Sequence, residues 1–64
     1  MNNVFDLYGT DLIFINNKWY SKKELCLEWF RMDNDSFYEK YGFNFNPHEF
    51  KGLYDWGRKT LYGE

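Results

Sequence analysis

The sequence predicts a small α+β domain: an N-terminal antiparallel β-hairpin or three-stranded meander, followed by two or three short helices. Three observations lead to this prediction. β-Branched and aromatic segments separated by turn residues fill positions 4–20, helix-start signals follow near positions 21 and 46, and 64 residues allow one small core. We therefore treat residues 1–64 as a single domain.

The first third of the chain has the pattern of antiparallel strands. Residues 4–8 predict a first strand, and residues 9–10 (Gly-Thr) predict a turn. Residues 12–15 (Leu-Ile-Phe-Ile) have no polar break, which suits a strand in the middle of a sheet. Because Asn tolerates positive φ, residues 16–17 (Asn-Asn) predict a two-residue hairpin turn, with residues 18–20 as the returning strand.

A first helix is predicted over residues 22–31. Ser21 and Glu24 have the spacing of a capping box at its start. Apolar side chains cover more than half of its circumference, whereas a surface helix needs an apolar stripe of roughly 100°. This helix is therefore expected either to be buried on most sides or to bury one face against a partner.

Two further helices are predicted, over residues 36–41 and over residues 47–62. Asp33 or Asp35 can cap the first of them, and Gly42 suits the left-handed residue at its end. Asn46 and Pro47 form a strong start signal for the second. Its apolar face includes Gly57, which would allow close approach of another backbone, although Gly52 and Gly57 also weaken the helix prediction.

The aromatic content is the unusual feature of the composition. The chain has seven Phe, six Tyr and three Trp among 64 residues. A domain of this size leaves roughly 40% of its unfolded-chain surface exposed, so some of these rings are expected to face outward. Since Trp and Tyr often anchor protein interfaces, we take six aromatic residues as candidate partner-binding residues. They are Trp19, Tyr38, Phe43, Phe45, Trp56 and Tyr62.

Catalytic, cofactor-binding and metal-binding residues are not predicted. One His and one Cys are too few for a structural zinc site, and no glycine-rich phosphate-binding loop is present. Cys26 is expected to be an inert buried thiol in the middle of a helix. The interpretation is that the protein is not an enzyme.

An alternative prediction is a helix-turn-helix-like nucleic-acid-binding protein. Residues 23–41 have the outline of helix, short turn and helix. The turn lacks the usual Gly, and the candidate recognition helix carries Asp35 and Glu39 against Lys40 alone. Phosphate binding needs cations, so the charge disfavours this alternative.

The composition and the absence of long apolar segments lead to expectations about the origin and location of the protein. The chain lacks Ala and Gln and is rich in residues with A/T-rich codons, as in phage and mobile-element genes and in many bacterial genes. The N-terminus lacks a signal-peptide pattern and the longest apolar run is residues 12–15, so we expect a cytoplasmic protein that does not contact membranes.

The leading hypothesis is a small interaction module, phage-encoded or from a mobile element, that inhibits or redirects a larger host or defence protein. A second copy of the chain is a further candidate partner.

Overall fold

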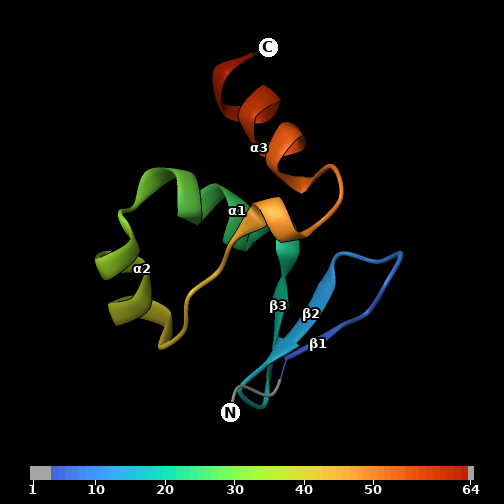
Figure 1. Cartoon of the computed structure of the whole chain (residues 1–64), viewed down its shortest axis with the longest axis vertical. Coiled ribbons are helices and arrows are strands. Elements are labelled where there is room, and N and C mark those ends of the chain that lie inside the picture. Colours follow the sequence, from blue (N-terminus) through green and yellow to red (C-terminus); the bar gives the residue numbers. More distant parts are fainter. Residues whose placement is uncertain (1–3, 64) are drawn as a thin grey trace.

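The computed structural model describes residues 4–63, and the strands precede the helices as predicted. An antiparallel sheet with strand order β1-β2-β3 is formed by β1 (Val4–Asp6), β2 (Leu12–Ile15) and β3 (Lys18–Ser21). After the sheet come α1 (Lys22–Arg31), α2 (Asn34–Tyr41), the 3₁₀ turn η1 (Pro47–Glu49) and α3 (Leu53–Tyr62). The predicted α+β architecture, in its three-stranded form, is confirmed (Figure 1).

The strand connections follow from local turn residues. Asn16 and Asn17 both have positive φ, at 51° and 68°, as a two-residue hairpin turn requires. The first strand ends at Asp6, two residues earlier than predicted. There the chain enters a turn in which the Thr10 hydroxyl donates to the Leu7 carbonyl at 2.8 Å. Residues 12–15 form the central strand, as their apolar sequence predicts.

The start of α1 is fixed by two side chains from different parts of the chain. The Ser21 hydroxyl accepts the Glu24 amide at 3.3 Å, which confirms the predicted cap. Asp11 adds a connection to the sheet: its carboxylate accepts the Lys23 amide at 2.9 Å and the Ser21 hydroxyl, and its carbonyl accepts the Lys22 amide at 2.6 Å. The first turn of α1 is therefore bonded directly to the chain that enters β2.

The structure corrects the predicted helix over residues 47–62. Asn46 accepts the His48 amide, so the start signal is real, but the turn that it caps ends at Glu49. Phe50 is extended (φ −117°, ψ 126°) and its ring lies 5.3 Å from that of Phe45. Gly52 then adopts a left-handed conformation (φ 76°), and α3 starts at Leu53. Packing of Phe50 and the turn at Gly52 thus divide the predicted helix in two.

The core lies on one side of the sheet, between the sheet and the helices. Alternation along β2 directs Ile13 and Ile15 into it. The close approach predicted at Gly57 is present: a Cβ at this position would lie 2.6 Å from the Cys26 sulfur. In Figure 1, α1 lies in the middle, with α2 to the left, α3 above and the strands below and to the right. The buried apolar residues are Ile13, Ile15, Leu25, Cys26, Phe37, Phe43, Phe45 and Leu53.

Candidate functional site

The face of the sheet that points away from the core is apolar. Phe5, Phe14 and Trp19 are aligned across the three strands, because Phe14 pairs with Phe5 in β1 and with Trp19 in β3. Residues directly opposite in antiparallel strands share a face, and Leu12 lies on the same face as Phe14 because side chains alternate along β2. We call these four residues, Phe5, Leu12, Phe14 and Trp19, the aromatic sheet face.

The rings on this face contact one another and remain accessible. The Phe14 and Trp19 ring centroids are 5.1 Å apart, and those of Phe5 and Trp19 are 6.5 Å apart in an edge-on arrangement. Phe5 is 56% exposed, Trp19 47% and Leu12 45%, whereas Phe14 is partly buried between the two outer rings. The rings thus hold each other in place while keeping large apolar surfaces in contact with water.

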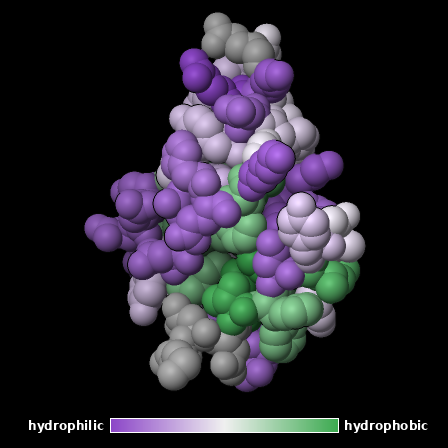
Figure 2. Space-filling model, turned by 45° about the vertical axis from the view of Figure 1, so that its right-hand side comes forward, coloured by the Kyte–Doolittle hydropathy of each residue, from purple (hydrophilic) through white to green (hydrophobic). Residues whose placement is uncertain are grey.

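The helices cover the opposite side of the sheet. The core side chains of β2 pack with residues of α1, α2 and α3, and the residues described here place no helix over the aromatic sheet face. Figure 2 shows apolar residues gathered in the lower half of the molecule, where Figure 1 places the strands, and hydrophilic residues above and to the left. An exposed apolar patch bordered by polar residues is typical of a protein interaction site.

The structure brings only one of the six predicted partner-binding residues, Trp19, into this face. Figure 1 shows α2 and α3 on other sides of the molecule, so Tyr38 and Tyr62 do not belong to it, although both are exposed. Trp56 is half-buried against the core, and the Lys23 ammonium lies 5.2 Å from its ring centroid. The predicted residues therefore do not form one patch.

Phe43 and Phe45 require a correction, because the structure places them in the core. They are 3% and 7% exposed. The segment that follows α2 packs between α2 and β3, where the Phe43 ring lies 5.3 Å from Tyr20 and 5.9 Å from Phe37. With so little accessible surface, both rings belong to the core, and neither is part of the aromatic sheet face.

Sequence reasoning missed Phe5, Leu12 and Phe14, although a signal was present. Side chains alternate between the two faces of a strand, and all four residues of the run Leu-Ile-Phe-Ile are apolar. A strand formed from this run therefore has two apolar faces. The helices that follow cover one face of a sheet, and the other then stays apolar and open.

The remaining groups to locate are possible metal ligands and the lone cysteine, Cys26. Within residues 4–63, no three His, Cys, Asp or Glu side chains form a cluster that could hold a metal ion. Cys26 is fully buried, and burial raises the pKa of its thiol, which lies 3.5 Å from the Leu53 carbonyl oxygen. A thiol in this environment is a poor nucleophile.

The helix-turn-helix outline is present, but its charge is unfavourable for nucleic acid. Asp33 caps α2 by accepting the Ser36 amide at 2.8 Å, and α2 starts two residues earlier than predicted. The single cation of the candidate recognition helix, Lys40, donates to Glu28 at 2.9 Å, and this bond raises the lysine pKa. The Glu28 carboxylate of α1 thus offsets part of the positive charge that this helix could offer to a phosphate.

None of the helices in the described part of the chain is long and apolar enough to cross a membrane. Comparison of the chain with protein-family models, curated proteins and solved structures gives no match.

Proposed function

We propose that this protein is a small interaction module that binds a larger protein through the aromatic sheet face. The observation that carries the proposal is the row Phe5, Phe14 and Trp19, whose outer rings are about half exposed on a sheet face that the described helices leave open. Trp is the residue type that most often dominates binding energy when a partner covers it. Trp19 contacts both other rings of the row, so we assign it the central role.

The biological role that we propose is inhibition or redirection of a host or defence protein by a phage or mobile-element product. The composition, which lacks Ala and Gln, and the small size support this part of the proposal. The partly offset charge of Lys40 and the acidic residues of α2 make nucleic acid the less favoured partner.

The test is capture of a partner by the tagged protein from lysate of the source or host cell, with and without nuclease. Trp19→Ser removes the central ring of the face, and Tyr38→Ser is the matched control because it removes an equally exposed ring from α2. We expect one protein, captured in stoichiometric amount, to withstand nuclease and to persist with Tyr38→Ser. With Trp19→Ser its affinity should fall at least about tenfold, as for the loss of an interface hot spot.

Circular dichroism of both variants is needed to show that each retains its fold. A partner that binds the Trp19 variant as tightly as the unchanged protein would exclude the aromatic sheet face as its site. If the captured protein is lost after nuclease treatment, the result would instead support the helix-turn-helix alternative.

A further inference from the structure

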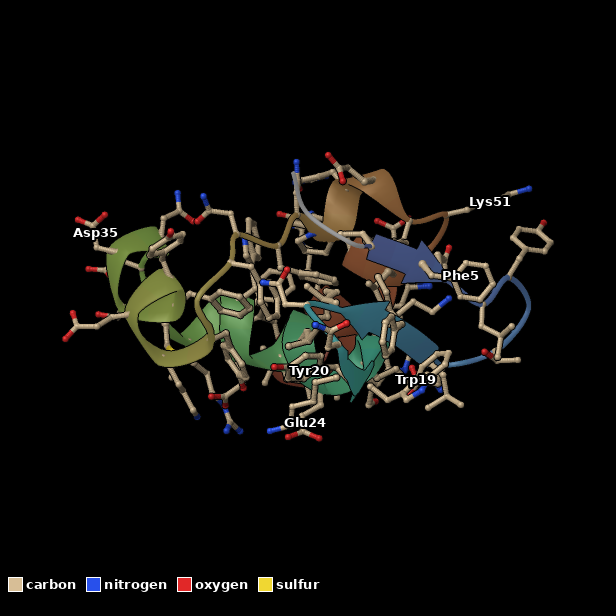
Figure 3. The ribbon with its side chains drawn as sticks, turned by 90° about the horizontal axis from the view of Figure 1, so that it is seen from below. Phe5, Trp19, Tyr20, Glu24, Asp35 and Lys51 are labelled. Carbon is tan, nitrogen blue, oxygen red and sulfur yellow. The ribbon has the colours of Figure 1, made fainter. Side chains whose placement is uncertain are left out.

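A cleft lined by lysines lies at the same end of the sheet as Leu12 of the aromatic sheet face. It has a volume of about 400 Å³ and lies between the turn before β2, the first turn of α1 and the chain that enters α3. Figure 3 shows Lys51 extending outward from the same end of the molecule as Phe5, with Asp35 at the opposite end. The side chains that give the cleft its character are Lys22, Lys23, Lys51, Phe50 and Trp56.

Two of the three ammonium groups have no carboxylate partner among residues 4–63. Lys22 forms an ion pair of 2.6 Å with Asp6. Within residues 4–63, neither Lys23 nor Lys51 has a carboxylate within ion-pair distance. Asp11 also lines the cleft, and its carboxylate, which accepts the Lys23 amide and the Ser21 hydroxyl, keeps its negative charge. The three lysines therefore exceed the two aspartates, Asp6 and Asp11, by one positive charge.

Aromatic rings form the apolar part of the cleft wall. The Lys23 ammonium lies 5.2 Å from the Trp56 ring centroid, and the Lys22 ammonium lies 5.9 Å from that of Phe50. Lysine ammonium groups act as compact charges for carboxylate and phosphate oxygens. Beside low-dielectric rings their attraction for an anion is screened less than on an open surface. The cleft suits an anionic group carried on a partly apolar ligand.

The position of the cleft connects it to the aromatic sheet face. Leu12 of the face pairs with Ser21, and the residues next to this pair in the chain, Asp11 and Lys22, both line the cleft. Lys22 pairs with Asp6 and lies over Phe50, on the side of the sheet that the helices cover. A protein that covers the aromatic sheet face therefore reaches the cleft by passing over the turn between β1 and β2. A rim of opposite charge beside an apolar contact is a common means of orienting a partner.

The charge distribution favours an acidic protein segment over nucleic acid. A nucleic-acid strand needs a groove of cations that follows its phosphates. Here the excess charge is confined to one cleft, Asp6 and Asp11 lie beside it, and the chain as a whole carries a net charge of −2. The excess positive charge of Lys23 and Lys51 favours a short acidic segment, whereas a longer polyanion would meet the neighbouring aspartates.

We propose that this lysine cleft binds the carboxylate side chains of an acidic segment on the protein partner that covers the aromatic sheet face. The inference rests on the proposed function, because it describes the partner of that face. It adds that the partner presents Asp or Glu next to an apolar surface, and that Lys23 and Lys51 fix its orientation.

The direct test is an NMR titration of the full-length, ¹⁵N-labelled protein with the peptide acetyl-Glu-Glu-Leu-Glu-amide. The matched control peptide has Gln in place of each Glu. We expect shifts of the Trp56 indole N–H and of the Lys23, Lys51 and Gly52 amides with the acidic peptide only, and a smaller effect at high salt.

Variants of the protein locate the site. Lys23 and Lys51 are exposed, so K23Q/K51Q should fold normally, and we expect it to weaken peptide binding about fivefold, as for the loss of two exposed ion pairs. K59Q, which removes an exposed lysine from the last turn of α3, should change binding less than about twofold. Equal shifts with the Gln peptide, or unchanged binding to K23Q/K51Q, would overturn the inference. Tighter binding of an oligothymidylate of matched charge would overturn it as well.

The inference and the proposed function fail in different ways. If the peptide does not bind but partner capture is lost with Trp19→Ser, the inference is wrong and the proposed function stands. If the peptide binds but capture is unaffected by Trp19→Ser, the proposed function is wrong, and with it the assignment of the cleft to a partner of the aromatic sheet face.

Discussion

At the scale of single residues, Asp33 shows how one side chain fixes a helix start. Its carboxylate accepts the Ser36 amide at 2.8 Å, and this bond, together with the bond to the Ser36 side chain, lowers the carboxyl pKa. The carboxylate also lies at the positive end of the helix dipole of α2. Asp33 therefore stabilises the fold in its charged form.

The lowered pKa of Asp33 predicts a pH-dependent advantage over asparagine. The folded protein binds this proton less readily than the unfolded chain, whose Asp has a pKa of about 3.9. The stabilisation is thus present above about pH 4 and is lost as the pH falls through the folded pKa. We expect Asp33→Asn, which retains a capping oxygen, to lower the free energy of unfolding at neutral pH and to have less effect at about pH 2.5. Urea unfolding of both proteins measures this, and a pH-independent difference would contradict it.

At the scale of elements, the contact between α1 and α3 depends on a missing side chain. A Cβ on Gly57 would lie 2.6 Å from the Cys26 sulfur and 2.8 Å from a Phe30 ring carbon. Cys26 is fully buried, so the sulfur has little space into which to move. Gly57 is costly for the helix itself, but it lets the two helices approach.

The expected effect of Gly57→Ala follows from two opposing terms. Alanine gains about 1 kcal/mol of helix propensity, whereas overpacking of a core costs about 1–3 kcal/mol. We expect a net loss of about 1 kcal/mol in the free energy of unfolding, measured by urea denaturation. In a Cys26→Ala background the sulfur is gone, and the loss should be smaller. Stabilisation by Gly57→Ala in the unchanged protein would show that the helices do not pack this closely.

The elements also show how far sequence reasoning reaches. Caps and turns depend on a few adjacent residues, so Ser21, Asn16-Asn17 and Gly42 could be assigned correctly. The break at residues 50–52 could not, because it depends on the packing of Phe50 against Phe45. The candidate site was predicted only at Trp19. Exposure of Phe5 and Leu12, and burial of Phe43, depend on which face of the sheet the later helices and loops cover, and adjacent residues do not determine this.

At the scale of the whole molecule, the protein is thin and has one uncovered layer. Its extents are 35, 28 and 15 Å, so no part of the chain lies far from the surface. The helices and the segment after α2 cover one face of the sheet, and the aromatic rings remain on the other. The helices and the sheet thus form two layers, and the proposed partner would form a third over the aromatic rings.

The size of the aromatic sheet face predicts that this third layer is not a second copy of the chain. Four side chains that each expose up to about half of roughly 200 Å² offer about 400 Å². Two such faces in contact bury about 800 Å², below the roughly 1,000 Å² of a stable interface, whereas a concave surface on a larger protein can also reach the neighbouring cleft. We therefore expect sedimentation equilibrium to show a monomer at micromolar concentrations. Any association at millimolar concentration should be weakened by Trp19→Ser and not by Tyr38→Ser. A micromolar dimer that Trp19→Ser dissociates would identify a second copy as the occupant of the face and would contradict the proposed larger partner.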